Sequence, residues 1–266
     1  MKIGIVGCAG RMGRMLVAEV LASPGCELAG GTERGDSPAL GQDVAVLGGG
    51  EASGVLVTDD ARALFTAADV IVDFTVPAAT VFHAGLAAET GTAMVIGTTG
   101  LGAEHQVAID ALAGKAAVVQ AANMSVGVNL LLGLTAQVAR VLGPEFDIEI
   151  VEMHHRHKVD APSGTALALG HAAAAGRGVT LDDVAQRVRD GHTGARRQGD
   201  IGFATLRGGD VVGDHTVLFA GEGEQLALTH KATSRAVLAR GAIRAARWVA
   251  GRAPGLYSMR DVLGLD

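Results

Sequence analysis

The sequence predicts an α/β protein with a parallel sheet in its N-terminal half and an α+β domain with a mixed, open sheet in its C-terminal half. Three observations lead to this prediction. Short aliphatic runs alternate with helical patterns through residues 1–120, as expected for a parallel sheet with right-handed crossovers. A glycine-rich turn separates the first run from the first helical pattern. Beyond Asn123 the pattern changes to a long apolar helix, followed by strand-like runs without long helices between them.

In the N-terminal half, runs of Val, Ile, Leu and Met predict strands, and apolar residues at helical spacing predict helices. The predicted strands are Ile3–Val6, Leu28–Thr32, Val55–Val57, Val70–Phe74, Met94–Ile96 and Val118–Gln120. The predicted helices are Arg11–Ala22, Ala78–Glu89 and Ala103–Ala113. The first helix ends at Ser23-Pro24-Gly25, because proline and glycine interrupt a helix.

In the C-terminal half, the pattern over Ser125–Leu142 predicts a long helix, and alternation over Phe146–Met153 predicts a half-buried strand. A second helix begins near Ser163, and a short amphipathic piece covers Leu181–Arg189. The remaining predicted elements are the strands Ile201–Arg207, His215–Phe219 and Gln225–His230 and a final helix over about Ser234–Ala250.

Composition excludes several classes of function. Hydrophobic residues make up 48% of the chain and aromatic residues only 3%, so we expect an aliphatic core. The net charge is −6, and no basic tract is available for a nucleic-acid backbone. The N-terminus lacks a signal-peptide pattern, and no apolar run approaches a membrane span. The two cysteines, Cys8 and Cys26, make neither a disulfide framework nor a metal site by themselves. We therefore expect a cytoplasmic protein with neither a nucleic-acid nor a membrane partner.

The segment Gly7–Gly13 reads Gly-Cys-Ala-Gly-Arg-Met-Gly and lies between the first strand and the first helix. Glycines permit a tight turn and a close approach of backbone to a pyrophosphate, and the helix N-terminus offers N–H groups and partial positive charge. A plain glycine turn would have the same composition, but the strand before it and the helix after it favour dinucleotide binding. Glu33 lies about 20 residues further on, where a carboxylate meets the adenosine ribose hydroxyls.

Arg34 leaves the choice between the two nicotinamide dinucleotides open. Glu33 favours the free ribose of NAD, whereas an arginine beside it favours the 2′-phosphate of NADP. A solvated loop charge explains Arg34 equally well. The segments Gly97–Gly100 and Ala121–Met124 follow strands, so they lie at the edge of a parallel sheet where ligands bind. Both are also compatible with ordinary strand-to-helix turns.

The densest cluster of functional side chains is His154-His155-Arg156-His157-Lys158, which precedes a helix beginning near Ser163. A metal site is a poor explanation, because adjacent histidines on a strand point to opposite faces and no carboxylate or cysteine completes a familiar spacing. A solvated structural cluster explains little of the pattern. Proton transfer to an anionic substrate explains it best, because the cluster combines imidazole and ammonium groups with an anion-binding helix start.

The sequence from His154 to Ala166 resembles the defining motif of the 4-hydroxy-tetrahydrodipicolinate reductase family, formerly called dihydrodipicolinate reductases. The resemblance extends over essentially the whole chain, since Gly7–Gly13, Glu33-Arg34, Asp73–Thr75, Gly97–Gly100, Asn123–Asn129 and His230–Arg235 occur in the family's order. It implies an N-terminal Rossmann domain over residues 1–125, rejoined by residues 235–266. It also implies a substrate-binding and oligomerisation domain over residues 126–234, a hinge and a homotetramer.

The resemblance also implies a role for each matching residue. His154 is the expected proton donor or acceptor and Lys158 the proton donor, while His155, Gly164 and Thr165 are expected to bind the substrate. The residues expected to hold the adenosine half of NADH or NADPH are Gly7, Cys8, Ala9, Gly10, Arg11, Met12, Glu33 and Arg34. The residues expected to hold the nicotinamide half are Gly97, Thr98, Thr99, Ala121, Ala122, Asn123 and Met124. No metal is expected.

The implied reaction is reduction of 4-hydroxy-tetrahydrodipicolinate, a small dicarboxylate, to tetrahydrodipicolinate with loss of water, in lysine and diaminopimelate biosynthesis. One departure is Met124, where many members of the family carry an aromatic residue. The alternative is another two-domain NAD(P)-dependent enzyme, such as an amino-acid or semialdehyde dehydrogenase. An acylating semialdehyde dehydrogenase needs a cysteine near mid-chain, whereas Cys8 and Cys26 lie at the start.

Overall fold

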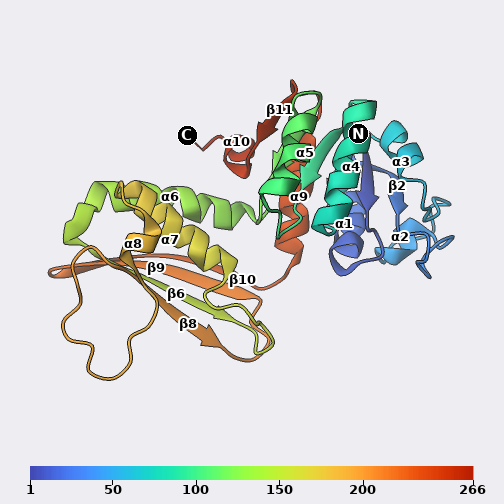
Figure 1. The fold of residues 1–266 in the computed structure, drawn as a ribbon. Coiled ribbons are helices and arrows are strands. Elements are labelled where there is room, and N and C mark those ends of the chain that lie inside the picture. Colours follow the sequence, from blue (N-terminus) through green and yellow to red (C-terminus); the bar gives the residue numbers. More distant parts are fainter. Residues whose placement is uncertain (266) are drawn as a thin grey trace. The chain divides into compact units, whose positions relative to one another are not determined.

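The computed structural model describes residues 1–265, which fold into two compact units (Figure 1). The first unit contains Met1–Val126 together with the chain from Ala236 onward. The second unit contains Gly127–Arg235. The first unit is therefore discontinuous in sequence, and its last helix belongs to the same core as its first strands.

The first unit is built on a fully parallel sheet with the strand order β11-β5-β4-β3-β1-β2. This confirms the predicted Rossmann-like arrangement. The strands are β1 (Lys2–Val6), β2 (Glu27–Thr32), β3 (Val70–Asp73), β4 (Ala93–Ile96), β5 (Ala117–Gln120) and β11 (Gly255–Tyr257). Strands β3 and β4 are buried along their whole length, as expected for a sheet with helices on both faces.

The helices of the first unit form two hydrophobic layers. One core contains residues of α1 and α9, and the other contains residues of α3, α4 and α5. These helices are α1 (Arg11–Ala22), α3 (Ala61–Ala67), α4 (Pro77–Thr90), α5 (Ala103–Ala113) and α9 (Ala236–Val249), accompanied by the short α2 (Val44–Leu47) and α10 (Met259–Leu263). Because both cores are aliphatic, the low aromatic content of the sequence does not limit the size of the core.

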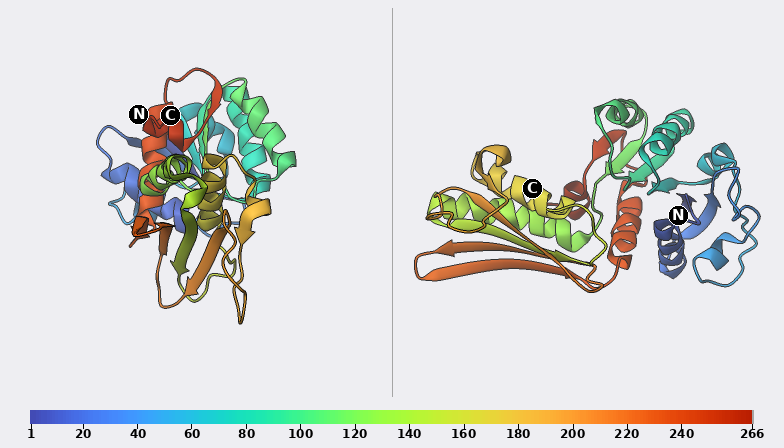
Figure 2. Two further views of the ribbon diagram at one scale, coloured as in Figure 1. Left: turned by 90° about the vertical axis from the view of Figure 1, so that its left-hand side faces the viewer. Right: turned by 60° about the horizontal axis from the view of Figure 1, so that its bottom comes forward.

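The second unit has a mixed sheet with the order β10-β9-β6-β8-β7, which confirms the predicted mixed sheet. Strand β6 (Asp147–His154) pairs parallel with β8 (Ile201–Arg207) and antiparallel with β9 (Gly213–Gly221). Helices α6 (Val126–Leu142) and α7 (Gly164–Gly176) lie on one face of this sheet (Figures 1 and 2). The remaining elements are β7 (Ala185–Gln186), β10 (Glu224–Ala232), α8 (Leu181–Val184) and the 3-10 turn Gly143–Glu145.

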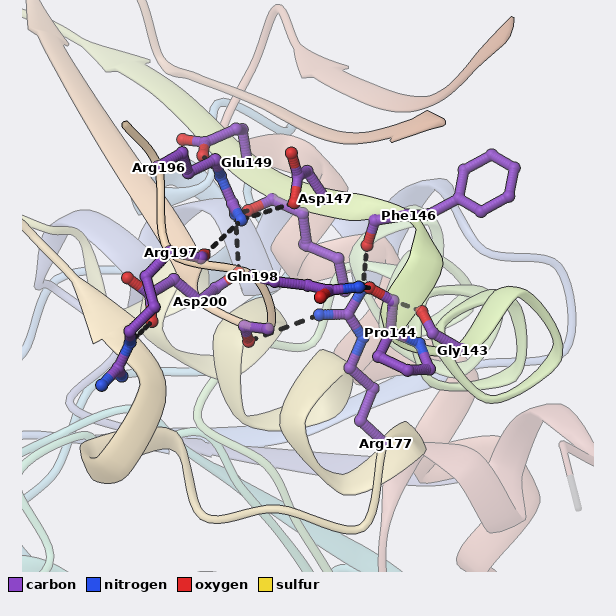
Figure 3. A network of polar contacts seen from close by, with 12 residues as sticks. Gly143, Pro144, Phe146, Asp147, Glu149, Arg177, Arg196, Arg197, Gln198 and Asp200 are labelled. Carbon is purple, nitrogen blue, oxygen red and sulfur yellow. Dashed lines mark hydrogen bonds and ion pairs between the residues drawn. The ribbon is translucent and has the colours of Figure 1, made fainter. Parts of the chain in front are cut away.

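The long loop that leads into β8 is fastened to the sheet by an arginine network (Figure 3). Arg196 donates to Asp147 Oδ1 at 2.6 Å and to Glu149 Oε1 at 2.9 Å. Arg189 binds both oxygens of Glu149 at 2.8 Å. A loop with few apolar side chains is thus ordered by ion pairs at the beginning of β6, the opposite end from His154.

The predicted strand over Val55–Val57 is wrong. This segment makes only isolated bridges, Leu56 to Asp43 and Thr58 to Thr32. Val44 N–H donates to the Val55 carbonyl, and Val57 N–H donates to the Gln42 carbonyl. Its backbone is therefore satisfied by a neighbouring loop instead of by the sheet. A short strand without alternation could not be distinguished from such a segment by sequence pattern.

The expectation about apolar length also needs correction. Helix α6 and the following turn, Val126–Glu145, are long and apolar enough to cross a membrane by length and composition, with a mean hydropathy of 1.4. The core helix of a globular protein meets the same criterion, and Leu131 and Ala139 of α6 do lie in the core of the second unit.

Candidate active site

The turn between β1 and α1 has a shape that only glycine permits. Gly7 has a φ of +66°, and its N–H donates to the Thr32 carbonyl at 2.8 Å. A Cβ at position 13 would lie 2.1 Å from the Gly7 carbonyl oxygen, so the start of α1 approaches the turn too closely for a side chain. Close backbone approach at a helix N-terminus is the arrangement that cradles a pyrophosphate.

A cavity of about 680 Å³ opens in the first unit beside this turn. It is lined by Gly7 and Gly10, by Thr32–Gly35 at the end of β2, and by Phe74–Val76 after β3. Strands β2 and β3 lie on opposite sides of β1, so the cavity lies outside the carboxyl ends of the strands where the strand order reverses. Dinucleotides bind at this position in open α/β sheets.

Glu33 and Arg34 both line the cavity but have different surroundings. Glu33 Oε1 accepts a hydrogen bond from the Ala9 N–H at 2.8 Å, which fixes the carboxylate against the glycine turn. The Arg34 side chain is 83% exposed and lies 3.6 Å from Asp36 Oδ1. The structure thus brings the predicted acidic residue to the turn and leaves the arginine in solvent at the rim.

Cys8 belongs to the turn, but its side chain points into the core. The residue is completely buried, and burial, reinforced by the nearby Glu33 carboxylate, raises the pKa of its thiol to about 12. Only the backbone of Cys8 is available to a ligand. Arg11 and Met12 begin α1 directly after the turn, with Arg11 exposed and Met12 half-buried.

The ends of β3 and β4 carry a polar network that was not predicted. Asp73 is fully buried and its carboxylate lies 2.8 Å from His83 Nδ1 and 2.6 Å from Thr75 Oγ1. Thr98 Oγ1 donates to the same carboxylate at 3.2 Å. Burial opposes ionisation of Asp73, but the hydrogen bonds from His83 and Thr75 outweigh it and lower its pKa. The network fixes the predicted loop Gly97–Gly100 against the end of β3.

The other segments predicted to contact the nicotinamide follow β4 and β5. Thr99 and Ala122 are exposed, and Ala121 and Asn123 are half-buried. Gly97 leaves room for the Phe74 ring, which a Cβ would approach to 2.2 Å. Met124 is fully buried in the core that contains α9, and its carbonyl packs against Gly241 of that helix, where a Cβ would approach it too closely.

In the second unit, β6 alternates strictly, with Ile148, Ile150, Glu152 and His154 buried on one side. His154 Nδ1 lies 2.6 Å from Glu152 Oε2. Arg207, at the end of the adjacent β8, donates to both oxygens of Glu152 at 2.8 and 2.9 Å. Burial opposes ionisation of Glu152, but these hydrogen bonds lower its pKa. The predicted proton-transfer histidine is therefore paired with an ionised carboxylate.

Lys158 lies in the loop after β6. Its Nζ donates to Asp160 Oδ1 at 2.7 Å, and this hydrogen bond lowers the pKa of Asp160. His155 N–H donates to the Val211 carbonyl at 2.7 Å. Burial of its ring and the positive charge of Arg235 lower the pKa of His155. The loop thus holds an ammonium group and an imidazole beside the end of β6.

The loop leads into α7, whose N-cap is Ser163. Ser163 Oγ accepts from the Ala166 N–H at 3.1 Å and lies 3.1 Å from His215 Nε2. Gly164 begins the helix facing open space, since nothing lies within 4 Å of a Cβ built there, and Thr165 follows it. One short loop, which carries Lys158, joins His154 at the end of β6 to the start of α7.

Three residues of this site were missed by sequence reasoning: Glu152, Arg207 and His215. Glu152 could have been found, because it precedes His154 by two positions on a strand and therefore shares its face. Arg207 and His215 come from β8 and β9, and their proximity depends on strand pairing that no motif reveals. Within residues 1–265, no group of three His, Cys, Asp or Glu residues is arranged to hold a metal ion.

Comparison with known proteins gives one consistent result along the chain. Residues 1–124 match the family model for the N-terminus of dihydrodipicolinate reductase, and residues 127–263 match the model for its C-terminus. The chain is 56% identical over 265 residues to the 4-hydroxy-tetrahydrodipicolinate reductase of Methylocella silvestris, covering 100% of this chain and 97% of the relative. It is 57% identical over 263 residues to the enzyme of the same name from Ruegeria pomeroyi, covering 99% and 98%.

A similar solved structure is the dipicolinate-bound dihydrodipicolinate reductase from Paenisporosarcina sp. TG-14. It is 26% identical to this chain, has a TM-score of 0.77, and the match covers 97% of each chain. The similarity therefore extends over both units.

Proposed function

The chain belongs to the dihydrodipicolinate reductase family, and we propose that it reduces 4-hydroxy-tetrahydrodipicolinate to tetrahydrodipicolinate with NADH or NADPH and loss of water. The observation that carries the proposal is the loop between β6 and α7. This loop carries Lys158 and joins His154, the last residue of β6, to the N-terminus of α7, which supports the proposal. Proton-transfer groups and an anion-binding helix start are what reduction of a dicarboxylate requires.

The first unit is suited to hold the dinucleotide. Its 680 Å³ cavity and its close-packed glycine turn fit a pyrophosphate, and Glu33 fits a ribose diol. Bound there, the nicotinamide would supply a hydride. We assign Gly7–Met12, Glu33 and Arg34 to the adenosine half and Gly97–Thr99 with Ala121–Met124 to the nicotinamide half.

The second unit is suited to bind the substrate and to manage protons. His155, Gly164 and Thr165 would bind its carboxylates, since the helix N-terminus and the nearby basic groups favour negative charge. Hydride addition to carbon leaves negative charge on a neighbouring atom, and Lys158 with His154 would supply the proton. An incoming carboxylate would compete with Asp160 for the Lys158 ammonium group, now 2.7 Å away.

We propose that both dinucleotides are accepted. Glu33 suits the free ribose hydroxyls, while the solvent-exposed Arg34 can reach a 2′-phosphate at the rim of the cavity. Calorimetric titration should show dissociation constants for NADH and NADPH within ~100-fold of each other, equivalent to about 2.7 kcal/mol. A larger preference would contradict this part of the proposal.

We also propose a cytoplasmic homotetramer. The outward side chains of β10 are largely exposed, including Leu226 at 41%. A long edge strand with exposed apolar side chains is unusual for a monomer, because it invites pairing with another chain. Association of identical chains through β10 would cover this edge.

A semialdehyde dehydrogenase is not favoured. Acylating enzymes of that kind need an accessible thiolate. Burial raises the pKa of the Cys8 thiol to about 12, and Cys26 directly precedes β2 in the first unit, whereas the basic motif belongs to the second unit.

The decisive experiment is turnover of enzymatically generated substrate, followed as consumption of NADH. Lys158→Ala should lower kcat by ~100-fold or more, because general acid catalysis contributes that much, while NADH binding survives. Lys115→Ala is the matched control, since Lys115 is exposed in the first unit. Wild-type protein without turnover would disprove the proposed function, and an unchanged Lys158→Ala would disprove the role of the lysine.

A further inference from the structure

Glu152 is a buried carboxylate beside the proton-transfer residues, and both of its oxygens accept hydrogen bonds. The residue is 1% exposed. Its oxygens accept from His154 Nδ1, from both terminal nitrogens of Arg207, and from the Ser163 N–H at 3.0 Å. Arg207 in turn donates to the Asp160 carbonyl at 2.6 Å. One carboxylate therefore contacts the ring of His154, the start of α7 and, through Arg207, the loop that carries Lys158.

We propose that Glu152 is a positioning residue, which fixes His154 in the tautomer that carries its proton on Nδ1 and holds the ring in register with the substrate cradle at α7. The inference rests on the proposed function for its catalytic consequence. Its structural content, the tautomer of His154, holds independently of the reaction.

The tautomer follows from the chemistry of the pair. An ionised carboxylate can only accept hydrogen bonds, so a 2.6 Å contact requires a proton on His154 Nδ1. Nε2 of the neutral ring is then left as the acceptor, and in the protonated ring it is the donor that can reach a ligand. A Cβ at position 213 would lie 3.0 Å from Nε2, so Gly213 leaves room beside this nitrogen.

The ionised state of Glu152 is maintained by Arg207. The bidentate hydrogen bond from Arg207 balances the buried negative charge and lowers the pKa of Glu152 against the opposing effect of burial. The ring of His215 packs edge-on against His154 with centroids 5.0 Å apart, which restricts rotation of the His154 ring. The orientation of His154 is thus fixed on two sides before any ligand binds.

Glu149 shows what a purely structural carboxylate on the same strand looks like. It also accepts from two arginines, Arg189 and Arg196. It lies near the beginning of β6 (Figure 3), and its hydrogen bonds within residues 1–265 come from arginines and not from a histidine. Glu149 and Glu152 therefore form a matched pair in which only the second contacts a proton-transfer residue.

The first measurement uses the wild-type protein alone. Long-range ¹H–¹⁵N correlation spectra of histidine side chains should show neutral His154 protonated on Nδ1. Observing the Nε2-protonated tautomer instead would overturn the inference, whatever the protein's activity.

The second measurement uses Glu152→Gln. The glutamine oxygen can take the position of Oε1 and still accept from Ser163 and Arg207, so the substrate cradle is kept. Its NH2 group would then replace Oε2, lose the hydrogen bond from Arg207 Nη1 and donate to His154 Nδ1, which moves the ring proton to Nε2. We expect kcat to fall by ~100-fold or more with little change in KM or in NADH affinity, because one general acid–base step is impaired.

Two comparisons separate positioning from structural support. Glu149→Gln should keep the wild-type kcat and the wild-type His154 spectrum even if it lowers the melting temperature. Glu152→Gln combined with His154→Gln should be no slower than His154→Gln alone, because the glutamate acts through that ring. A wild-type kcat in Glu152→Gln, or multiplicative losses in the double variant, would overturn the inference, whereas wild-type protein without turnover would count against the proposed function alone.

Discussion

His215 is the residue whose ionisation the fold changes most clearly among the histidines. It is 4% exposed, and burial, together with the nearby His154, lowers its pKa to about 4 from an ordinary 6.5. The ring is therefore neutral at pH 7, and its Nε2 lies 3.1 Å from Ser163 Oγ. Ser163 Oγ also accepts from the Ala166 N–H, so His215 contacts the residue that caps α7. The neutral ring thus supports the N-cap of α7.

A neutral buried histidine makes the second unit sensitive to acid. The unfolded chain binds this proton near pH 6.5 and the folded chain only near pH 4, so stability present above pH 6.5 is lost as the pH falls toward 4. Between pH 7.5 and 5.5 the free energy of unfolding should fall by ~1.3 kcal/mol from this group. Hydrogen exchange of β9, corrected for intrinsic rates, measures the fall, and His215→Gln should remove it. The same slope in the variant would show that another group is responsible.

At the scale of elements, β6 organises the second unit, because it takes part in one polar network near its beginning and in a different one near its end. The arginine network of the loop before β8 contacts Asp147 and Glu149, and the Glu152 network contacts His154. With a rise of ~3.3 Å per residue, the nearest members of the two networks, Glu149 and Glu152, lie ~10 Å apart along the strand, and their side chains are on opposite faces. The two networks can therefore be altered separately.

Replacing Arg196 tests this separation. Arg196→Met should lower the stability of the second unit by ~2 kcal/mol, because Asp147 and the carbonyls of Ile148 and Asp200 lose a donor. The protection of β8 amides against hydrogen exchange should fall with it. The kcat should remain that of the wild type, and a loss comparable with that of Lys158→Ala would show that the two ends of β6 are coupled.

At the scale of the whole molecule, the two units have separate hydrophobic cores. Two clusters lie around the parallel sheet, and the third lies between the mixed sheet and its helices. Helices α6 and α7 cover one face of the mixed sheet. Strand β10 forms one edge of this sheet, and its side chains are largely exposed. The proposed homotetramer would use this region.

Sedimentation velocity tests the proposed assembly. The wild-type protein should sediment with the mass of four chains, and Leu226→Glu on β10 should shift it to smaller species, because a buried unpaired charge opposes association. Val107→Glu, at an exposed apolar position of α5, is the control and should leave the mass unchanged. A monomeric wild-type protein would contradict the assembly, and an unaffected Leu226→Glu would place the interface elsewhere.

The sequence by itself determined the α/β class, the glycine turn and the motif at the end of β6. In each case the signal is local: alternating periodicity, glycines at fixed spacing, or proton-transfer groups directly before a helix start. The signal for Glu152, which was missed, is local as well, because two residues on a strand that are two positions apart lie on the same face.

The tertiary structure alone decided which distant residues complete the sites. Arg207 and His215 reach Glu152 and Ser163 because β8 and β9 pair with β6 on either side, and strand register is not encoded by any neighbouring residues. The same holds for His83, which meets Asp73 because α4 packs against the parallel sheet. The prediction of a strand over Val55–Val57 was wrong because this segment forms backbone hydrogen bonds with Gln42 and Val44 in a neighbouring loop, and not with a strand of the sheet. Periodicity reports which face of an element is buried, whereas its partner is chosen by the packing of the whole chain.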